Sequence, residues 1–271
     1  MSTPRPLDGQ VALVTGAGSG LGAAFARRLR ADGAIVVVND ISADAASAVA
    51  IEVDGDVAVF DVTDATAFDT EVDKAVERHG RLDIVVNNAG IAPPSDPDRT
   101  QRSIANQMLR MEGRIGEMTP PDSLVSLSDA DWDRMIRVHL YGTFHGTRAA
   151  LRHMTPVRRG AVVNVSSVLG LRPMAGVAHY AAAKAGIIAL TKSAGQEVAP
   201  FGVRVNAVCP GWIDTPLLAP LDPITRGAIT MQIPHGRMGT AEEIAELVRF
   251  LCGPESSYCN GDVFAASGGF T

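Results

Sequence analysis

The sequence has no long apolar run, no excess of positive charge and few cysteines. Every apolar run is shorter than the roughly 18 residues that a membrane-spanning helix needs, which argues against an integral membrane protein. The first ten residues, MSTPRPLDGQ, lack the apolar core of a secretory signal, so we expect a cytoplasmic protein. A net charge of −6 at pH 7 offers no basic surface for nucleic acid or an anionic membrane.

The three cysteines, Cys209, Cys252 and Cys259, are odd in number and lack the spacing of metal ligands. We interpret them as reduced thiols packed in the fold, and we predict no metal site.

The sequence does contain a regular alternation of short apolar runs and longer helical patterns. The short runs are almost wholly apolar, which is typical of parallel strands covered on both faces. The predicted strands are residues 11–15, 34–39, 57–60, 83–87, 161–166, 203–208 and 262–266. The predicted helices lie near residues 20–32, 42–50, 66–79, 129–154, 179–199 and 240–252. This order predicts an α/β fold: one Rossmann-like domain over 1–271, with a doubly wound, seven-stranded, mostly parallel sheet and helices on both faces.

Residues 91–128 interrupt this alternation with a connection far longer than the usual few residues. Within it, residues 102–115 predict a short helix, with apolar side chains on one side at Ile104, Met108, Met111 and Ile115. Two interpretations remain open: a surface insertion, or a lid or wall over a substrate pocket.

The sequence TGAGSGLG, residues 15–22, joins the first strand to the first helix. Its glycines at 16, 20 and 22 permit a tight turn, close approach of a ligand and close helix packing. Free N–H groups at the start of the helix can then hold a pyrophosphate.

Two carboxylates follow the next two strands. Asp40 can accept hydrogen bonds from the ribose hydroxyls of an adenosine and would repel a 2′-phosphate, although it is also suited to a solvated turn with Ser42. Ser19 and Ile41, where a basic residue would bind that phosphate, are uncharged, so we predict NAD rather than NADP. Asp61 is positioned either to meet the adenine amino group or to cap the following helix.

Tyr180 and Lys184, in HYAAAKAG, lie four residues apart and therefore on one face of a helix. A phenol is a poor base at neutral pH, but a neighbouring ammonium favours the phenolate. Such a pair can take a proton from an alcohol, or return one to a ketone, while a hydride passes to or from nicotinamide.

Taken together, these motifs resemble the short-chain dehydrogenase/reductase family in its short, single-domain form. The similarity runs nearly end to end and leaves out only residues 91–128. It is carried by TGAGSGLG (15–22), Asp61, NNAG (87–90), VNVSS (163–167), YAAAK (180–184), PGWIDT (210–215) and SGG (267–269).

The resemblance implies a role for each matching position. The cofactor would contact Gly16, Ser19, Gly20, Leu21, Gly22, Asp40, Asp61, Val62, Asn88, Ala89, Gly90, Tyr180, Lys184, Pro210, Gly211, Ile213 and Thr215. Ser167 would hydrogen-bond the substrate oxygen, while Ser166 would be structural. Tyr180 would act as the acid or base, and Lys184 would hold the nicotinamide ribose and tune the phenol.

One position departs from the family pattern, which has an asparagine seven residues after a tryptophan. Here Trp132 is followed by His139. His139 shares an inward helical stripe with Trp132, Met135, Ile136 and Thr143. It is either a packed core histidine or a member of the catalytic site. In the second case its imidazole would carry a proton relay from Lys184 to solvent, or interrupt it.

These features favour an NAD(H)-dependent oxidoreductase that interconverts a secondary alcohol and a ketone. An NAD site mildly favours the oxidative direction. The substrate is expected to be apolar around the carbonyl, because apolar side chains occur in both candidate pocket segments. They are Met108, Leu109, Met111, Pro216, Leu217 and Leu218.

Two other functions remain open. The segment from YAAAKAG to IPHGRMG is similar to 3-oxoacyl carrier-protein reductases, which typically use NADPH, a preference that Asp40 argues against. Such a reductase also needs a basic docking patch, which the insertion offers at Arg99, Arg102, Arg110 and Arg114. A catalytically weakened NAD-binding scaffold or sensor is supported only by His139.

The resemblance further implies a homo-oligomer, most often a tetramer packed through the helices at 129–154 and 179–199.

Overall fold

The computed structural model describes residues 5–93 and 97–271, and its centre is one seven-stranded sheet. The strands are β1 (Val11–Val14), β2 (Ile35–Asp40), β3 (Asp56–Val59), β4 (Ile84–Asn87), β5 (Gly160–Val165), β6 (Val203–Pro210) and β7 (Val263–Ala266). Their order is β3-β2-β1-β4-β5-β6-β7, and every pair is parallel. All seven predicted strands are therefore present, and the sheet is entirely rather than mostly parallel.

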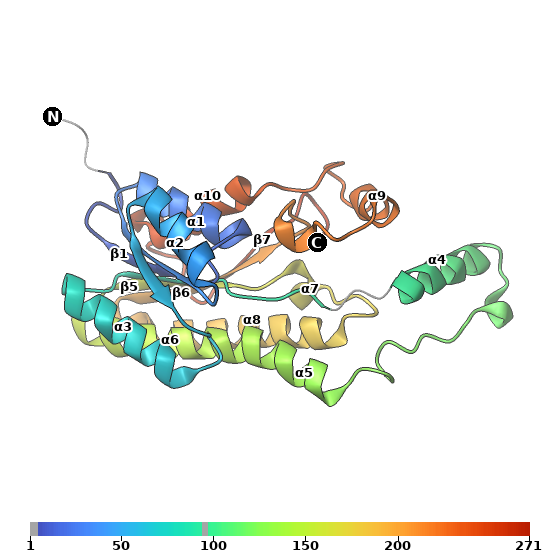
Figure 1. Ribbon diagram of the computed structural model, residues 1–271, viewed down its shortest axis with the longest axis horizontal. Coiled ribbons are helices and arrows are strands. Elements are labelled where there is room, and N and C mark those ends of the chain that lie inside the picture. The colour runs from blue at the N-terminus through green and yellow to red at the C-terminus, as the bar shows by residue number, and fades with distance from the viewer. Residues whose placement is uncertain (1–4, 94–96) are drawn as a thin grey trace.

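Helices cover both faces of this sheet, as predicted (Figure 1). One face carries α1 (Gly20–Ala31), α2 (Ala43–Val53) and α10 (Ala241–Cys252), and the other carries α3 (Ala65–His79), α6 (Gly142–Val157) and α8 (Ala178–Val198). Alternate residues of a strand point to opposite faces. Val14 therefore packs under α1 and α10, whereas Leu13 packs under α3 and α6.

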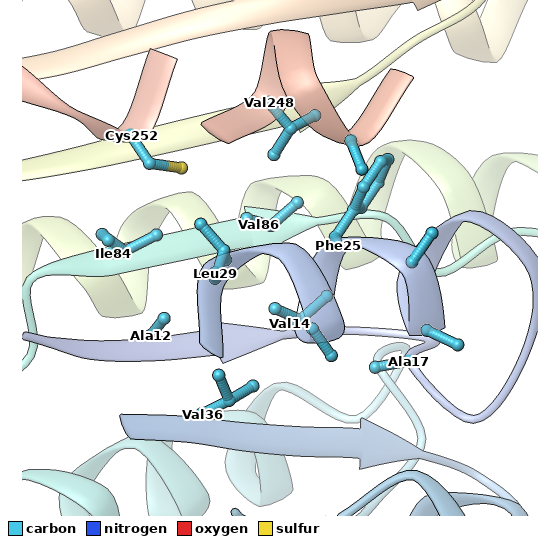
Figure 2. Close-up of a cluster of buried hydrophobic side chains, with 14 of the residues drawn as sticks. Ala12, Val14, Ala17, Phe25, Leu29, Val36, Ile84, Val86, Val248 and Cys252 are labelled. Atoms are coloured by element: carbon cyan, nitrogen blue, oxygen red, sulfur yellow. The ribbon is translucent and has the colours of Figure 1, made fainter. Parts of the chain in front are cut away.

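The core beneath α1 and α10 is drawn in Figure 2. Phe25 and Leu29 of α1 lie in one cluster with Val14 and Val86, and all four side chains are fully buried. Burying each such side chain stabilises the fold by roughly 1.5–3 kcal/mol. Cys252 is buried in the same core. All three cysteines are free thiols, of which Cys209 and Cys252 are buried.

The helix predicted over 129–154 has an unexpected wide turn in its middle. α5 (Asp129–Ile136) begins after the cap Ser128 and leads into a π-helical turn, Arg137–Tyr141, which continues into α6. Such wide turns are uncommon and occur frequently at functional sites. His139 lies in the middle of this one.

Two further helices were not predicted: α7 (Val168–Leu171) and α9 (Pro223–Met231). α7 is too short to produce a periodic pattern. The start of α9 did have a local signal, because Asp222 caps it by accepting from the N–H groups of Ile224 and Thr225, and Pro223 occupies the first turn.

The insertion forms an arm, defined here as residues 97–128, that projects away from the sheet (Figure 1). It contains α4 (Pro97–Met111) and a single 3₁₀ turn, Ile115–Glu117, so the helix begins and ends earlier than predicted. Residues 94–96 of the insertion lie outside the described residues. The arm returns past the segment before α8: a Cβ on Gly176 would lie 3.9 Å from the Ser123 hydroxyl.

Within the described ranges, no helix combines the length and apolar character that crossing a membrane requires.

Candidate active site

The predicted site residues converge at one edge of the sheet. Parallel strands end at the same edge, so the loops after β1, β4, β5 and β6 lie side by side there. These loops carry residues 15–22, 88–90, 166–167 and 210–215. Ligands of doubly wound sheets bind at this edge, where the strand order reverses on either side of β1.

The glycine-rich turn leaves no room for side chains. Gly20 begins α1 with φ +52°, which favours glycine, and a Cβ on Gly22 would lie 2.2 Å from the Gly16 carbonyl oxygen. The N-cap residue Ser19 makes no side-chain capping bond, so its hydroxyl leaves the first N–H groups of α1 unbonded. Across the loops, a Cβ on Gly20 would lie 3.7 Å from the Thr215 Cβ.

Asp40 connects β2 to this turn. Its Oδ2 accepts a hydrogen bond of 3.0 Å from the Gly18 N–H, while its Oδ1 accepts one of 3.0 Å from the Ser42 N–H. The one carboxylate of Asp40 therefore bonds both the turn at Ser42 and the glycine-rich loop.

The loop after β4 is held against the same turn. The Asn88 side-chain amide donates to the carbonyl oxygens of Thr15 and Gly16 at 3.0 and 3.2 Å. The Thr15 hydroxyl in turn accepts from the N–H groups of Asn88 and Ala89 at 3.0 and 3.1 Å. Asn88 thus fixes the geometry of the turn.

The two interpretations of Asp61 are now separated. Asp64, not Asp61, is the N-cap of α3, because its carboxylate accepts from the N–H groups of Thr66 and Ala67. The Asp61 carboxylate accepts a local bond from the Thr63 N–H at 2.8 Å, and within the described residues no other bond to this side chain occurs.

Ser167, Tyr180 and Lys184 come together between β5 and α8. Ser167 is near enough to Tyr180 for its side chain to lower the pKa of the phenol, and the Lys184 ammonium lies 5.6 Å from the centre of the Tyr180 ring. Lys184 donates to the Val165 carbonyl at 2.9 Å, which holds its side chain against the end of β5. Ser166 donates to the Lys184 carbonyl at 2.8 Å, in keeping with the structural role expected of it.

The pKa values differ from the sequence-based expectation of a phenol acidified by a nearby ammonium. Burial raises the pKa of Tyr180, and the hydrogen bond from Ser167 opposes this only in part. Burial also lowers the pKa of Lys184 to about 7, so its positive charge is reduced near neutral pH. Loss of water around each group is the largest cause of both shifts in pKa.

His139 is buried and packs edge-on against Tyr180, with ring centres 5.2 Å apart. Its Nε2 lies 3.2 Å from the Ile91 nitrogen and 3.0 Å from the Ile91 oxygen, so the tautomer decides which of these bonds forms. Its Nδ1 has no hydrogen-bond partner among the described residues. Burial and the charge of Lys184 hold the pKa of His139 well below its usual range, so the imidazole is neutral.

This geometry limits what His139 can do. A relay through an imidazole needs a proton carrier at each nitrogen, but Nε2 faces a backbone amide that cannot pass a proton onward. Nδ1 is buried and has no partner among the described residues to receive a proton. One residue of the predicted inward stripe does not point fully inward. Trp132 is 39% exposed, whereas Met135 and Thr143 are buried.

One buried group beside the site was not anticipated. His179, directly before Tyr180, is 4% exposed, and neither ring nitrogen has a partner within the described residues. Only its adjacency to Tyr180 could have drawn attention to it. No cluster of three potential metal ligands occurs in residues 5–93 and 97–271.

Comparison with known proteins agrees with this geometry. The family model described as short chain dehydrogenase matches residues 10–224. The chain is 37% identical over 268 residues to 3-oxoacyl-(acyl-carrier-protein) reductase FabG of Thermotoga maritima, covering 97% of this chain and 98% of the relative. It is 40% identical over 266 residues to cis-4-hydroxycyclohexanecarboxylate dehydrogenase of Sinomonas cyclohexanicum, covering 97% and 96%. The chain therefore belongs to the short-chain dehydrogenase family, whose members are oxidoreductases that use a nicotinamide cofactor.

Proposed function

We propose that this protein is an NAD(H)-dependent oxidoreductase that interconverts a secondary alcohol and a ketone. The observation that carries the proposal is the meeting of Ser167, Tyr180 and Lys184 at the sheet edge that also holds the glycine-rich turn. A proton-transfer group and a dinucleotide cradle at one edge suit hydride transfer to or from a carbinol carbon.

The site fits a dinucleotide in its cradle, because side chains on the glycines would fill the space. Gly16, Ser19, Gly20, Leu21 and Gly22 would hold the pyrophosphate at the start of α1. The remaining contacts would follow along the sheet edge. They are Asp40 with the ribose, Asp61 and Val62 with adenine, Asn88, Ala89, Gly90, Pro210 and Gly211 beside the cofactor, and Ile213 and Thr215 with the carboxamide.

NAD is the preferred cofactor in this proposal. The Asp40 carboxylate stands beside the glycine-rich turn, where it would accept from ribose hydroxyls and repel a 2′-phosphate. Ile41 beside it is 71% exposed and uncharged, and offers no compensating cation.

Bound NAD would supply the acceptor for the hydride, and the protein's own groups would handle the proton. Tyr180, once deprotonated to its phenolate, would take the proton of the alcohol, while Ser167 would hydrogen-bond the same oxygen as charge develops on it. Lys184 would hold the cofactor ribose. Because the pKa of Lys184 is about 7, its ammonium would lose its proton close to neutral pH. His139 would fix Ile91 next to Gly90, which makes it a positioning residue.

The substrate is proposed to be apolar around the carbonyl. Met108 and Met111 on α4 are 62% and 89% exposed, and Leu217 in the loop after β6 is 49% exposed. An apolar substrate would cover such side chains and remove them from water.

A carrier-protein reductase is the second candidate, favoured by the similarity to the FabG relatives. The proposed docking patch, however, is largely neutralised within the arm. Arg99 and Arg102 both lie against Asp122, and Arg114 pairs with Glu112 and Glu117. These pairs weaken the attraction of the arm for an acidic carrier.

A scaffold without activity is the least favoured candidate, because Ser167, Tyr180 and Lys184 are intact and lie together.

Members of this family generally act on small molecules and form oligomers. We propose a homotetramer packed through α6 and α8. Tyr141 and Phe144, at the start of α6, are 47% and 43% exposed, which supports a contact with another subunit. Gly142 and Gly146 do not add to this argument, because they face Val62 and Asn87 inside the subunit. Light scattering that finds a monomer at micromolar concentration would exclude the tetramer.

The function is tested by following nicotinamide absorbance with a panel of secondary alcohols and NAD or NADP, and with acetoacetyl thioesters and NADH or NADPH. We expect alcohol oxidation with NAD. Strong preference for NADPH and thioesters would select the carrier-protein reductase, and absence of turnover with all of them would select the scaffold.

A further inference from the structure

Arg172 lies on the segment that connects Ser167 to Tyr180, directly after α7. Its Nη1 donates to the Phe270 carbonyl at 3.0 Å, and its guanidinium lies over the Phe270 ring, 5.5 Å from the ring centre. No ion pair to Arg172 occurs within the described residues, and the side chain is exposed. Arg172 is thus an anchored cation whose other N–H groups remain available.

The anchor belongs to the apolar cluster around the catalytic phenol. Phe270 is 6% exposed and packs with Val168 and Leu169, and Tyr180 and Trp212 pack against the same cluster. The ring under Arg172 and the ring of Tyr180 are therefore parts of one packed unit. A guanidinium held over such a ring loses little conformational freedom when it binds a ligand.

This arrangement suits an anionic group on a substrate. A guanidinium presents planar donors that match a carboxylate or phosphate. Ser167 and Arg172 flank the four-residue helix α7 at its two ends. An anion bound by Arg172 would therefore lie several bonds away from a carbinol oxygen bound by Ser167 and Tyr180.

We propose that Arg172 binds an anionic group of the substrate, remote from the reacting carbon, and thereby selects hydroxy or keto compounds that carry a negative charge. The proposal rests on the oxidoreductase function proposed above and defines its substrate class. The anion has two possible sources: the carboxylate of a small hydroxy acid, or a phosphate of a carrier thioester.

The chain provides a matched control in Arg158. Its Nη2 donates to the Pro200 carbonyl at 2.6 Å, and its guanidinium lies 5.6 Å from the centre of the Phe201 ring. Arg158 thus makes the same pair of contacts as Arg172, but it precedes β5 and lies at the opposite edge of the sheet. Arg158→Gln removes an equivalent anchored cation without touching the segment from Ser167 to Tyr180.

The test compares wild type, Arg172→Gln, Arg172→Lys and Arg158→Gln on two pairs of compounds. The first pair is 4-hydroxycyclohexanecarboxylate and its neutral carboxamide with NAD. The second is acetoacetyl-coenzyme A and the phosphate-free acetoacetyl-N-acetylcysteamine with NADH. We expect Arg172→Gln to raise KM for the charged member of one pair about tenfold or more and to change the neutral member less than twofold. Arg172→Lys should restore part of the loss, and Arg158→Gln should have no effect.

If Arg172→Gln raises KM only for 4-hydroxycyclohexanecarboxylate, the anion is a carboxylate. If it raises KM only for acetoacetyl-coenzyme A, the anion is a phosphate. Equal losses on charged and neutral members, or unchanged KM for both charged compounds, would overturn the proposal. Thermal shifts of the NADH complex with each charged compound provide a measurement without turnover: Arg172→Gln should abolish the shift, and an unchanged shift counts against the proposal. If wild type oxidises or reduces none of the four compounds, the function proposed above fails, while the shifts still decide whether Arg172 binds the anion.

Discussion

The imidazole of His139 meets the phenol of Tyr180 edge-on, at an angle of 85°, while its Nε2 faces the backbone of Ile91. His139, in the π-helical turn, thus contacts both Tyr180 on α8 and Ile91, the first residue of the insertion. This arrangement leaves His139 without a second proton carrier, and we interpret it as a positioning residue.

We therefore expect His139→Asn to retain or raise activity, because an amide can also bond the Ile91 backbone. The measurement is kcat and KM for the best alcohol, together with circular dichroism to check the fold. A loss of more than about tenfold in a folded variant would make the imidazole a specific participant.

Replacing Tyr180 with Phe should abolish measurable turnover and leave cofactor binding unchanged, because only the hydroxyl is removed. We expect a fall in kcat of at least about 100-fold, with the Kd for NADH, measured by fluorescence titration, within a factor of two of wild type. Substantial residual activity would assign the proton transfer to another group.

Replacing Asp40 with Ser, together with Ile41→Arg, should move the cofactor preference toward NADP. The substitution removes the repulsion of a 2′-phosphate and adds a cation beside it. We expect the ratio of kcat/KM for NAD over NADP to fall by at least about tenfold. Ile41→Arg alone is the control. If Asp40→Ser leaves the ratio of kcat/KM values unchanged, Asp40 serves only the turn with Ser42 and Gly18.

The lowered pKa of Lys184 predicts how stability depends on pH. Unfolding returns this group from a pKa of about 7 to its ordinary value of 10.5, so the unfolded chain binds more protons between these values. Stability therefore rises with pH in this window. Relative to Lys184→Met, the cofactor-free wild type should gain up to about 2 kcal/mol between pH 7 and 9. Urea denaturation of both proteins measures the difference. A constant difference would mean that Lys184 keeps its ordinary pKa.

Gly146→Ala should destabilise the subunit itself. A Cβ there would lie 1.9 Å from the Asn87 side-chain oxygen, so we expect a loss of about 1–3 kcal/mol in the free energy of unfolding. Gly227→Ala in α9 is the control, because no atom lies within 4 Å of its Cβ and alanine favours a helix. If Gly146→Ala instead dissociates the oligomer without loss of stability, the glycine serves an interface.

The sequence alone predicted the architecture, and its resemblance to the short-chain dehydrogenase/reductase family supplied the expected members of the candidate site. Fully apolar runs such as residues 84–86 report burial on both faces, and burial of this kind follows from the local pattern. The spacing of Tyr180 and Lys184 is likewise a property of one helix, so it is visible before the chain folds.

Only the tertiary structure decided how these groups behave. The contact of His139 with Ile91 joins residues 48 positions apart, and the anchor of Arg172 on Phe270 joins residues 98 apart. No local pattern specifies such distant partners. The pKa values of Tyr180 and Lys184 depend on how much water the whole fold removes from them. Spacing therefore predicted that Tyr180 and Lys184 share one helix face, whereas burial set their pKa values.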